Sequence, residues 1–176
     1  FAFTLDVCVD KESYEIKDVS FKNCCIRVRE NFRYDTERQE NDETYKFIKA
    51  FILKINRKYR YVDNIETSHD IIAYSMILMN YLAAQEMLKY NTGIFRTAKL
   101  SGNFVAPDNV PSDVVKFLKM WNSFGGKYVK FHEVEGHDML ELDAYIHITS
   151  PIRRLVDLLN IIELQKVLGI VKLSEK

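Results

Sequence analysis

Residues Tyr145–Ile162 read YIHITSPIRRLVDLLNII, and this stretch decides how the whole chain is interpreted. The pattern predicts a helix over about 151–168, with Ser150 as its N-cap and Pro151 at its first position. Arg153 and Arg154 would then lie in the first turn, beside free backbone N–H groups and the positive end of the helix dipole. Cations are unfavourable there, so a negative group is expected nearby.

Two kinds of negative group fit this position. A phosphate would meet free N–H groups and two guanidinium forks, which match its oxygens bidentately. The alternative is an internal ion pair with Asp157, which lies four residues after Arg153 and three after Arg154. Such a pair could occupy one arginine but hardly both. The residues alone leave the two interpretations equally supported.

The composition is that of a soluble globular domain. The chain has 176 residues, of which 47% are apolar and 28% are charged, enough for one domain with a real core. The 25 basic and 25 acidic side chains balance, so a polyanionic partner would need local basic patches. No stretch is expected to be long and apolar enough to span a membrane.

The cysteines and histidines show no metal-site pattern. Cys8, Cys24 and Cys25 lack zinc-like spacing, and their odd number argues against a disulfide framework, so we expect small buried thiols in a reducing compartment. No histidine lies in a metal-binding motif, and all four are expected to be hydrogen-bonded structural residues. No closely spaced aspartates that could hold magnesium occur in the sequence.

The order of expected elements gives an α+β fold in one domain. Residues 1–29 predict a β-hairpin, since two β-branched and aromatic runs flank a polar stretch. A helix is expected over much of 33–59, with the polar first half as a separate short helix or a loop. Two more helices are expected, one over 67–93 with Thr67 or Ser68 as cap and one over 112–126 with a glycine stop. An extended segment, a loop and a mixed region are expected at 94–100, 101–111 and 127–148.

Two stretches mix cations with aromatic residues, a composition that suits single-stranded nucleic acids. They are CCIRVRENFRY at 24–34 and KINRKYRY at 54–61. On a continued strand, Arg27 and Arg29 would share one face. A solvated charged surface is the favoured alternative for both stretches.

The segment YIHITSPIRRLVD strongly resembles the signature Y-x-H-F-T-S-P-I-R-R-Y-x-D of the ribonuclease II and ribonuclease R family, the RNB-domain exoribonucleases. The preceding GHDMLELDAY is similar to the family's G-H-F-G-L-x-L-x-x-Y. Fainter similarities follow in order along the chain: the hairpin with a family tyrosine at Tyr34, the helix with Met76 and Asn80 in register, and the segment around Arg96. The chain thus resembles the C-terminal half of an RNB domain.

The resemblance implies that 1–176 is the C-terminal part of one RNB exoribonuclease domain, an N-terminal antiparallel β-hairpin packed with several long helices. The aspartates that hold magnesium in the family would lie upstream of Phe1. The implied activity is processive 3′-to-5′ hydrolysis of single-stranded RNA by magnesium-activated water, releasing 5′ nucleotides. Implied partners are single-stranded RNA, the remainder of the RNB domain and flanking OB-type domains, with a cytoplasmic location and no membrane.

The resemblance also implies roles for individual residues. Arg153 would be catalytic, stabilising the charge that develops on the scissile phosphate. Arg154 would hold a neighbouring phosphate, with Ser150 and Thr149 beside it. Tyr34 would line the RNA channel near the terminal bases.

Several departures from the family pattern leave two other interpretations open. Ala73 and Tyr74 replace glutamates, one of which helps hold the terminal nucleotide in the family, and Leu155 replaces the signature tyrosine. These changes favour a degenerate RNB domain that binds RNA or a protein partner without cutting. An unrelated helical domain with an accidental TSPIRR would require the matched segments to lie apart in space.

Overall fold

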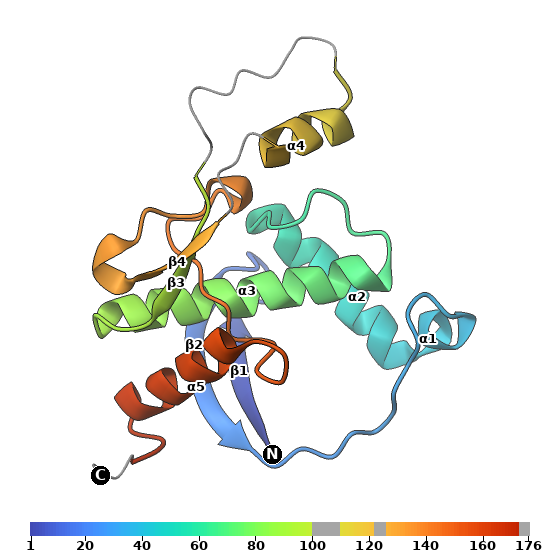
Figure 1. Ribbon diagram of the computed structural model, residues 1–176. Helices are drawn as coiled ribbons and strands as arrows, with labels where there is room; N and C mark the ends of the chain where they lie inside the picture. The colour runs from blue at the N-terminus through green and yellow to red at the C-terminus, as the bar shows by residue number, and fades with distance from the viewer. Residues whose placement is uncertain (100–109, 122–125, 173–176) are drawn as a thin grey trace. The chain divides into compact units, whose positions relative to one another are not determined.

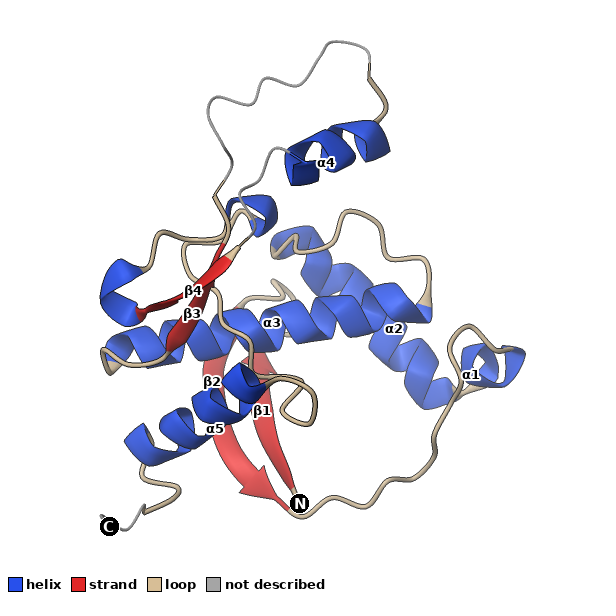
Figure 2. Ribbon diagram, viewed as in Figure 1, coloured by secondary structure: helices blue, strands red, loops and turns tan. Residues whose placement is uncertain are grey.

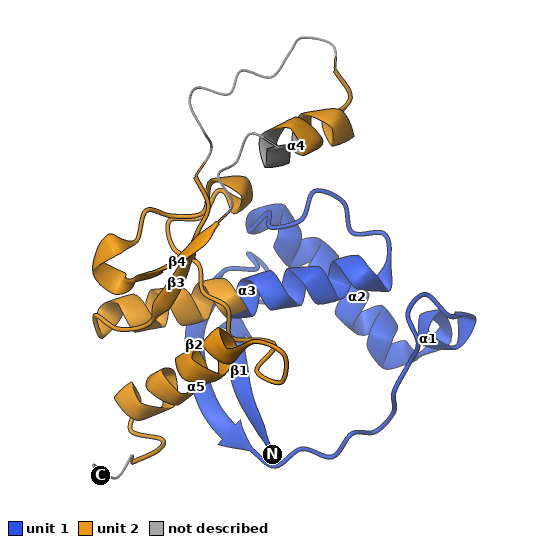
Figure 3. Cartoon of the chain, in the orientation of Figure 1, with its two compact units in different colours: residues 1–79 blue, residues 80–176 orange. Residues whose placement is uncertain are grey.

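The computed structural model describes residues 1–99, 110–121 and 126–172 (Figure 1). It has the expected α+β composition, with an N-terminal antiparallel hairpin and several helices (Figure 2). The chain forms two compact units, 1–79 and 80–176 (Figure 3). Most of the loop expected at 101–111, and the expected glycine stop at Gly125, lie outside the described residues.

The hairpin of the first unit is shorter than expected. Strand β1 (Ala2–Val9) pairs with β2 (Ile16–Cys24), and the first register pair is Ala2 with Cys24. Strand β2 ends at Cys24, and 25–33 form no regular structure. The expected strand through Arg27 and Arg29 is wrong, because this segment leaves the hairpin and Arg29 pairs with Asp42 at 2.7 Å.

The three cysteines are free, but the prediction that they are buried is wrong. Cys8 and Cys25 are exposed, and Cys24 is only partly buried. Cys8 and Cys24 belong to the two-stranded hairpin, whose faces alternate between partly buried and exposed residues. A sheet of two strands offers little cover for such small side chains.

The polar segment before the second helix does form a separate short helix. Helix α1 (Glu37–Asn41) is capped by Thr36, and α2 (Glu43–Lys58) is capped by Asp42, whose side chain accepts the Tyr45 N–H at 2.9 Å. The capping side chains satisfy N–H groups that lack a partner within the helix. The core of the first unit forms where α2 meets the following loop and α3; its buried residues are Tyr45, Ile52, Ile55, Ile65, Ile71 and Tyr74.

Helix α3 (Ser68–Lys89) begins as expected at a Thr67 cap. Thr67 Oγ1 accepts the Asp70 N–H, and Asp70 Oδ2 accepts the Thr67 N–H at 2.8 Å, a reciprocal arrangement. Contrary to expectation, α3 is long and apolar enough to cross a membrane by length and composition. Core helices of soluble proteins pass the same test, and Tyr74 and Met87 of α3 are buried. The membrane evidence is therefore weak.

The second unit is built on a short antiparallel ribbon. Strand β3 (Ile94–Thr97) pairs with β4 (Lys127–Lys130), and the ribbon is accompanied by α4 (Ser112–Trp121) and α5 (Leu155–Val167). Two one-turn 3₁₀ helices, η1 (Phe131–Glu133) and η2 (Asp138–Leu140), follow β4. Phe95 of β3 also bridges to Ile146, which brings the segment before α5 against the ribbon.

Candidate functional site

Helix α5 begins at Leu155, four residues later than the sequence predicts. Residues 151–153 form a turn, in which the Ser150 carbonyl accepts the N–H groups of Arg153 at 3.2 Å and Arg154 at 3.1 Å. Ser150 is therefore not the N-cap, and Pro151 is not the first helical residue. The cause is Asp157, whose buried carboxylate accepts the Ser150 N–H at 2.7 Å and holds the turn against the helix.

Arg154 pairs with the same carboxylate. Its Nη2 donates to Asp157 Oδ1 at 2.9 Å, and its Nε lies 2.8 Å from Oδ2, an ion-pair contact that is not aligned as a hydrogen bond. The Asp157 side chain is fully buried, whereas 23% of the Arg154 side chain is exposed. The ion-pair interpretation thus holds for Arg154, whose Nη1 has no partner in the described part of the chain.

Arg153 is arranged differently from its neighbour. It is exposed, and no side chain among residues 1–99, 110–121 and 126–172 pairs with it. The adjacent Ile152 is fully exposed as well, so the turn extends into solvent. One arginine is held internally and the other presents a free guanidinium, the group best suited to bind an anionic oxygen pair.

Two further predicted residues lie beside this turn, and a third belongs to the other unit. Ser150 contributes its backbone groups, and Thr149 has a buried Oγ1 without a hydrogen-bond partner. Tyr34 belongs to the first unit, where its ring stacks on His69 with centroids 3.9 Å apart. Tyr34 is 51% exposed, so the stacked rings of Tyr34 and His69 lie at the surface of that unit.

Two buried asparagines fix the strand-like segment that leads into the turn. Asn80 donates to the Tyr145 hydroxyl at 2.8 Å and accepts the Ile148 N–H at 3.0 Å. Asn160 of α5 donates to the His147 carbonyl at 3.0 Å and bonds both backbone groups of Ile94 at 2.9 Å. Each buried amide is thereby satisfied, and the segment has a defined position relative to the ribbon and α5.

His147 is a half-buried, hydrogen-bonded residue, as expected for a structural histidine. Its Nδ1 lies 2.7 Å from the Tyr128 hydroxyl. Burial, followed by the charge of Arg154, lowers the pKa of His147 to about 4, with Arg96 acting in the same direction. The imidazole is therefore neutral at physiological pH. His132 and His69 are exposed instead, so the prediction of structural histidines does not hold for all four.

Sequence reasoning missed Tyr128. The Arg96 guanidinium lies over its ring, 5.2 Å from the centroid, and the two residues are direct cross-strand partners. The signal in the sequence was the run KYVK at 127–130, which combines two lysines, one tyrosine and one valine in a short strand.

The two basic and aromatic stretches of the first unit are partly structural. Arg29 pairs with Asp42 at 2.7 Å. The Tyr59 hydroxyl accepts the Ile16 N–H at 3.1 Å, and Tyr61 packs on a core tyrosine. The aromatic rings at 59 and 61 therefore serve the packing of this unit. The cations of this stretch, Lys54, Arg57, Lys58 and Arg60, are exposed, which agrees with the favoured alternative of a solvated charged surface.

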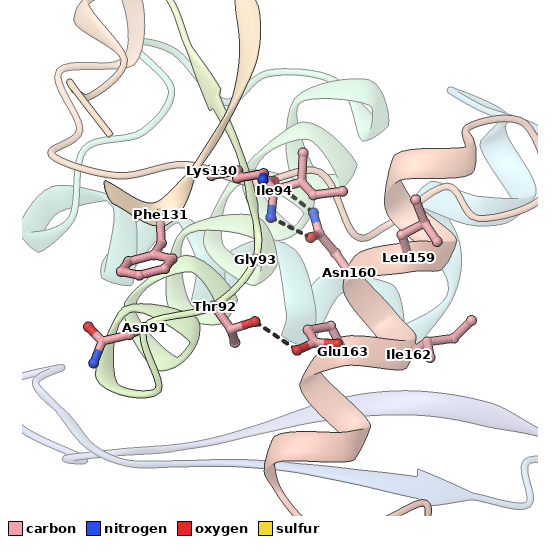
Figure 4. A pocket seen from close by; sticks show the side chains of 10 residues that line it. All are labelled: Asn91, Thr92, Gly93, Ile94, Lys130, Phe131, Leu159, Asn160, Ile162 and Glu163. Atoms are coloured by element: carbon pink, nitrogen blue, oxygen red, sulfur yellow. Dashed lines mark hydrogen bonds between the residues drawn. The ribbon is translucent and has the colours of Figure 1, made fainter. Parts of the chain in front are cut away.

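A pocket of about 390 Å³ lies between the turn after α3, the ribbon and α5 (Figure 4). Inside it, the Thr92 hydroxyl donates to Glu163 at 2.8 Å, and the Asn160 amide bonds Ile94. Its remaining lining is Asn91, Gly93, Lys130, Phe131, Leu159 and Ile162. The pocket therefore combines apolar walls with one cation, Lys130, and one carboxylate, Glu163.

The described residues do not fit a magnesium ion. Within 1–99, 110–121 and 126–172, no three His, Cys, Asp or Glu side chains converge to hold a metal. Magnesium prefers carboxylate oxygens and water, and the one carboxylate of the turn, Asp157, is buried and paired with Arg154.

The segments of the second unit that resemble the RNB family contact one another in space. Phe95 bridges to Ile146, Ala98 bridges to His137, and Asn80 bonds Tyr145. The RNB domain family matches residues 120–170, which include β4, the arginine turn and α5. This partial match supports membership of the RNB-domain exoribonuclease family. No curated protein matches this RNB-domain chain.

The match gives the arginine turn a general functional context. The RNB domain is that of an exoribonuclease family, so the match is consistent with RNA as the class of substrate. An accidental TSPIRR in an unrelated helical domain is wrong, because the matched segments lie together and the family match spans the turn.

Proposed function

We propose that this chain is the C-terminal part of an RNB exoribonuclease domain that hydrolyses single-stranded RNA processively from its 3′ end and releases 5′ nucleotides. The observation that carries the proposal is the exposed, unpaired Arg153 on a turn fixed by the Arg154–Asp157 pair. A free guanidinium on a fixed backbone is preorganised for the charge that develops on a phosphate.

Each residue of the turn has its own part in this proposal. Arg153 contacts the scissile phosphate, where a fork of donors outperforms a point charge. Arg154 keeps its pair with Asp157 and offers Nη1 to a neighbouring phosphate. Ser150 and Thr149 border the same position, and Tyr34 stacks with the terminal bases of the RNA. The wider proposal includes magnesium held by carboxylates other than the described ones, flanking OB-type domains and a cytoplasmic location.

A second candidate function is a domain that binds RNA without cutting it. Tyr74 supports this candidate, since Ala73 and Tyr74 stand where the resemblance places two glutamates, one of which helps hold the terminal nucleotide in the family. Its side chain is only 1% exposed and packs in the core of the first unit, 5.4 Å from the ring of Tyr61. A core side chain is not available to hold a nucleotide.

The two candidates are separated by following both ends of one RNA. The full-length protein is incubated with magnesium and a single-stranded RNA labelled at either the 5′ or the 3′ end. The proposal predicts immediate release of labelled mononucleotide from the 3′-labelled RNA and short end products from the 5′-labelled RNA. Binding without any shortening contradicts the exonuclease and supports the second candidate.

A further inference from the structure

The β3–β4 ribbon has one covered face and one open face. Paired residues of an antiparallel ribbon point to the same side, and neighbours along a strand alternate. Phe95, Thr97 and Val129 form the covered face, with exposed fractions of 0%, 2% and 8%. The open face carries the cross-strand pairs Ile94 with Lys130 and Arg96 with Tyr128.

Tyr128 on this open face is both held and accessible. Its backbone is fixed by the ribbon, Arg96 covers one ring face at 5.2 Å, and its hydroxyl meets His147 at 2.7 Å. Even so, 45% of the residue remains exposed. An aromatic side chain that is immobilised in advance loses little conformational entropy when a ligand stacks on it.

The surroundings of Tyr128 favour an anionic ligand. Lys130 is exposed two residues further along the same face, and no acidic side chain in the described part of the chain pairs with it. Lys130 also lies at the rim of the pocket beside α5 (Figure 4). Arg96 adds a second cation, whose charge reaches both His137 and His147.

Aromatic rings beside cations are the elements that hold single-stranded nucleic acids, because bases stack on the rings and phosphates follow the charges. We propose that the open face of the β3–β4 ribbon is a second RNA contact, with Tyr128 as a base-stacking platform and Lys130 as the contact of an adjacent phosphate. The inference rests on the proposed function, because its ligand is the same single-stranded RNA.

The ribbon contact belongs to the same unit as the arginine turn. His147 touches Tyr128 on one side, and its imidazole feels the charge of Arg154 on the other. The backbone from 147 to 153 connects the two places. An RNA strand bound at Arg153 therefore has a neighbouring aromatic surface within the second unit on which a base can stack.

The test measures the affinity of full-length Tyr128→Leu for a labelled single-stranded oligoadenylate, with EDTA present to prevent cleavage. Loss of the ring is expected to weaken binding about tenfold, since base–aromatic stacking is worth on the order of 1–3 kcal/mol. Tyr128→Phe keeps the ring and should bind within about twofold of the wild-type protein. Tyr90→Leu is the matched control, because Tyr90 is 46% exposed and lies outside the ribbon.

A second arm identifies stacking rather than a general loss of structure. Single nucleotides of the RNA are replaced one at a time by abasic residues. At the position that stacks on Tyr128, the abasic residue should weaken binding to the wild-type protein about tenfold. It should not weaken binding to Tyr128→Leu any further, because that variant already lacks the ring. Lys130→Ala should reduce the number of counterions released on binding, which the salt dependence of the affinity measures, by about one.

The outcomes separate this inference from the proposed function. If the wild-type protein binds the RNA and Tyr128→Leu binds it equally well, the ribbon contact is wrong and the proposed function stands. The same conclusion follows if the loss of affinity caused by Tyr128→Leu and the loss caused by the abasic residue add at every position of the RNA. If Tyr90→Leu weakens binding as much as Tyr128→Leu, the ring at 128 has no special role. If the wild-type protein binds no RNA, both proposals fail together.

Discussion

Asp157 is a single buried carboxylate that determines what its two neighbouring arginines do. It accepts the Ser150 N–H and the Arg154 guanidinium, and both contacts lie on the inner side of the turn. The charge of Arg154 is thereby compensated within the protein. Arg153 has no such partner among the described residues, so its charge is available to a ligand.

Replacement of either member of this pair should destabilise the fold. Asp157→Asn and Arg154→Ala are each expected to lower the free energy of unfolding by about 2 kcal/mol, between the values for exposed and for fully buried pairs. The double variant should lose less than the sum of the two, because the second change removes a group that already lacks its partner. Urea unfolding of the three variants checks this, and strictly additive losses would contradict the pair.

The pKa of His147 makes a prediction about pH. The folded protein keeps this imidazole neutral down to about pH 4, whereas the unfolded chain binds a proton near the ordinary value of 6.5. Between these values the unfolded state binds more protons, so stability should fall as pH is lowered from about 6.5 to 4. Burial is the main cause of the lowered pKa of His147; the charges of Arg154, Arg96 and His137 lower it further, and Asp157 opposes them.

His147→Gln tests that prediction. The variant removes the titrating group, so the melting temperature should depend less on pH between about 4 and 6.5 than it does in the wild-type protein. His132→Gln serves as the control, because His132 is exposed. An unchanged pH dependence in His147→Gln would contradict a depressed pKa at this residue.

At the scale of elements, α5 is tied to the ribbon by one side chain. Asn160 accepts the Ile94 N–H and donates to the carbonyls of Ile94 and His147, while it is only 1% exposed. These bonds satisfy both backbone groups of Ile94 in β3. The contact between α5 and β3 therefore depends on a buried polar residue of the helix.

Asn160→Ala should lower the free energy of unfolding by about 2–3 kcal/mol, because buried backbone groups would lose their partners. Hydrogen exchange should also become faster at the Ile94 amide, whose bond is lost directly. The amide of Val115 in α4 bonds the Pro111 carbonyl instead and should be unaffected. Equal acceleration at both amides would indicate global rather than local loosening.

The elements show where sequence patterns suffice and where they do not. The hairpin, the separate α1 and the Thr67 cap of α3 follow from local signals, namely β-branched runs and capping side chains. The start of α5 does not, because a buried carboxylate one turn into the helix binds back to Ser150. The end of β2 does not follow from local signals either, because the residues after it leave the hairpin and Arg29 pairs with Asp42.

The candidate site was predictable to a similar degree. The proximity of Arg153, Arg154 and Asp157 follows from their spacing, and the suggestion that one pair leaves one arginine free agrees with the structure. Which arginine is free depends on the turn, so the sequence could not decide it. The exposure of Tyr128 depends on a ribbon whose two strands are far apart in the chain.

At the scale of the whole molecule, the described residues include the proposed RNA contacts but no group of His, Cys, Asp or Glu side chains that could hold magnesium. We predict that a polypeptide of residues 1–176 does not shorten single-stranded RNA, because metal-activated water is central to the proposed chemistry. The assay adds magnesium to the purified polypeptide and a labelled RNA, with the full-length protein as the positive control. Magnesium-dependent shortening by the polypeptide alone would overturn this prediction.

The most direct measurement of the central claim compares Arg153→Ala with the wild-type full-length protein in single-turnover RNA cleavage and in RNA binding. Loss of one preorganised donor to the scissile phosphate should slow cleavage by about 10²–10³-fold. The melting temperature should stay unchanged, since Arg153 is exposed and unpaired. RNA affinity should change only a few-fold, because other contacts remain, and Arg153→Lys should rescue little. Equal losses of affinity and cleavage rate, or a destabilised fold with normal cleavage, would contradict the role assigned to Arg153.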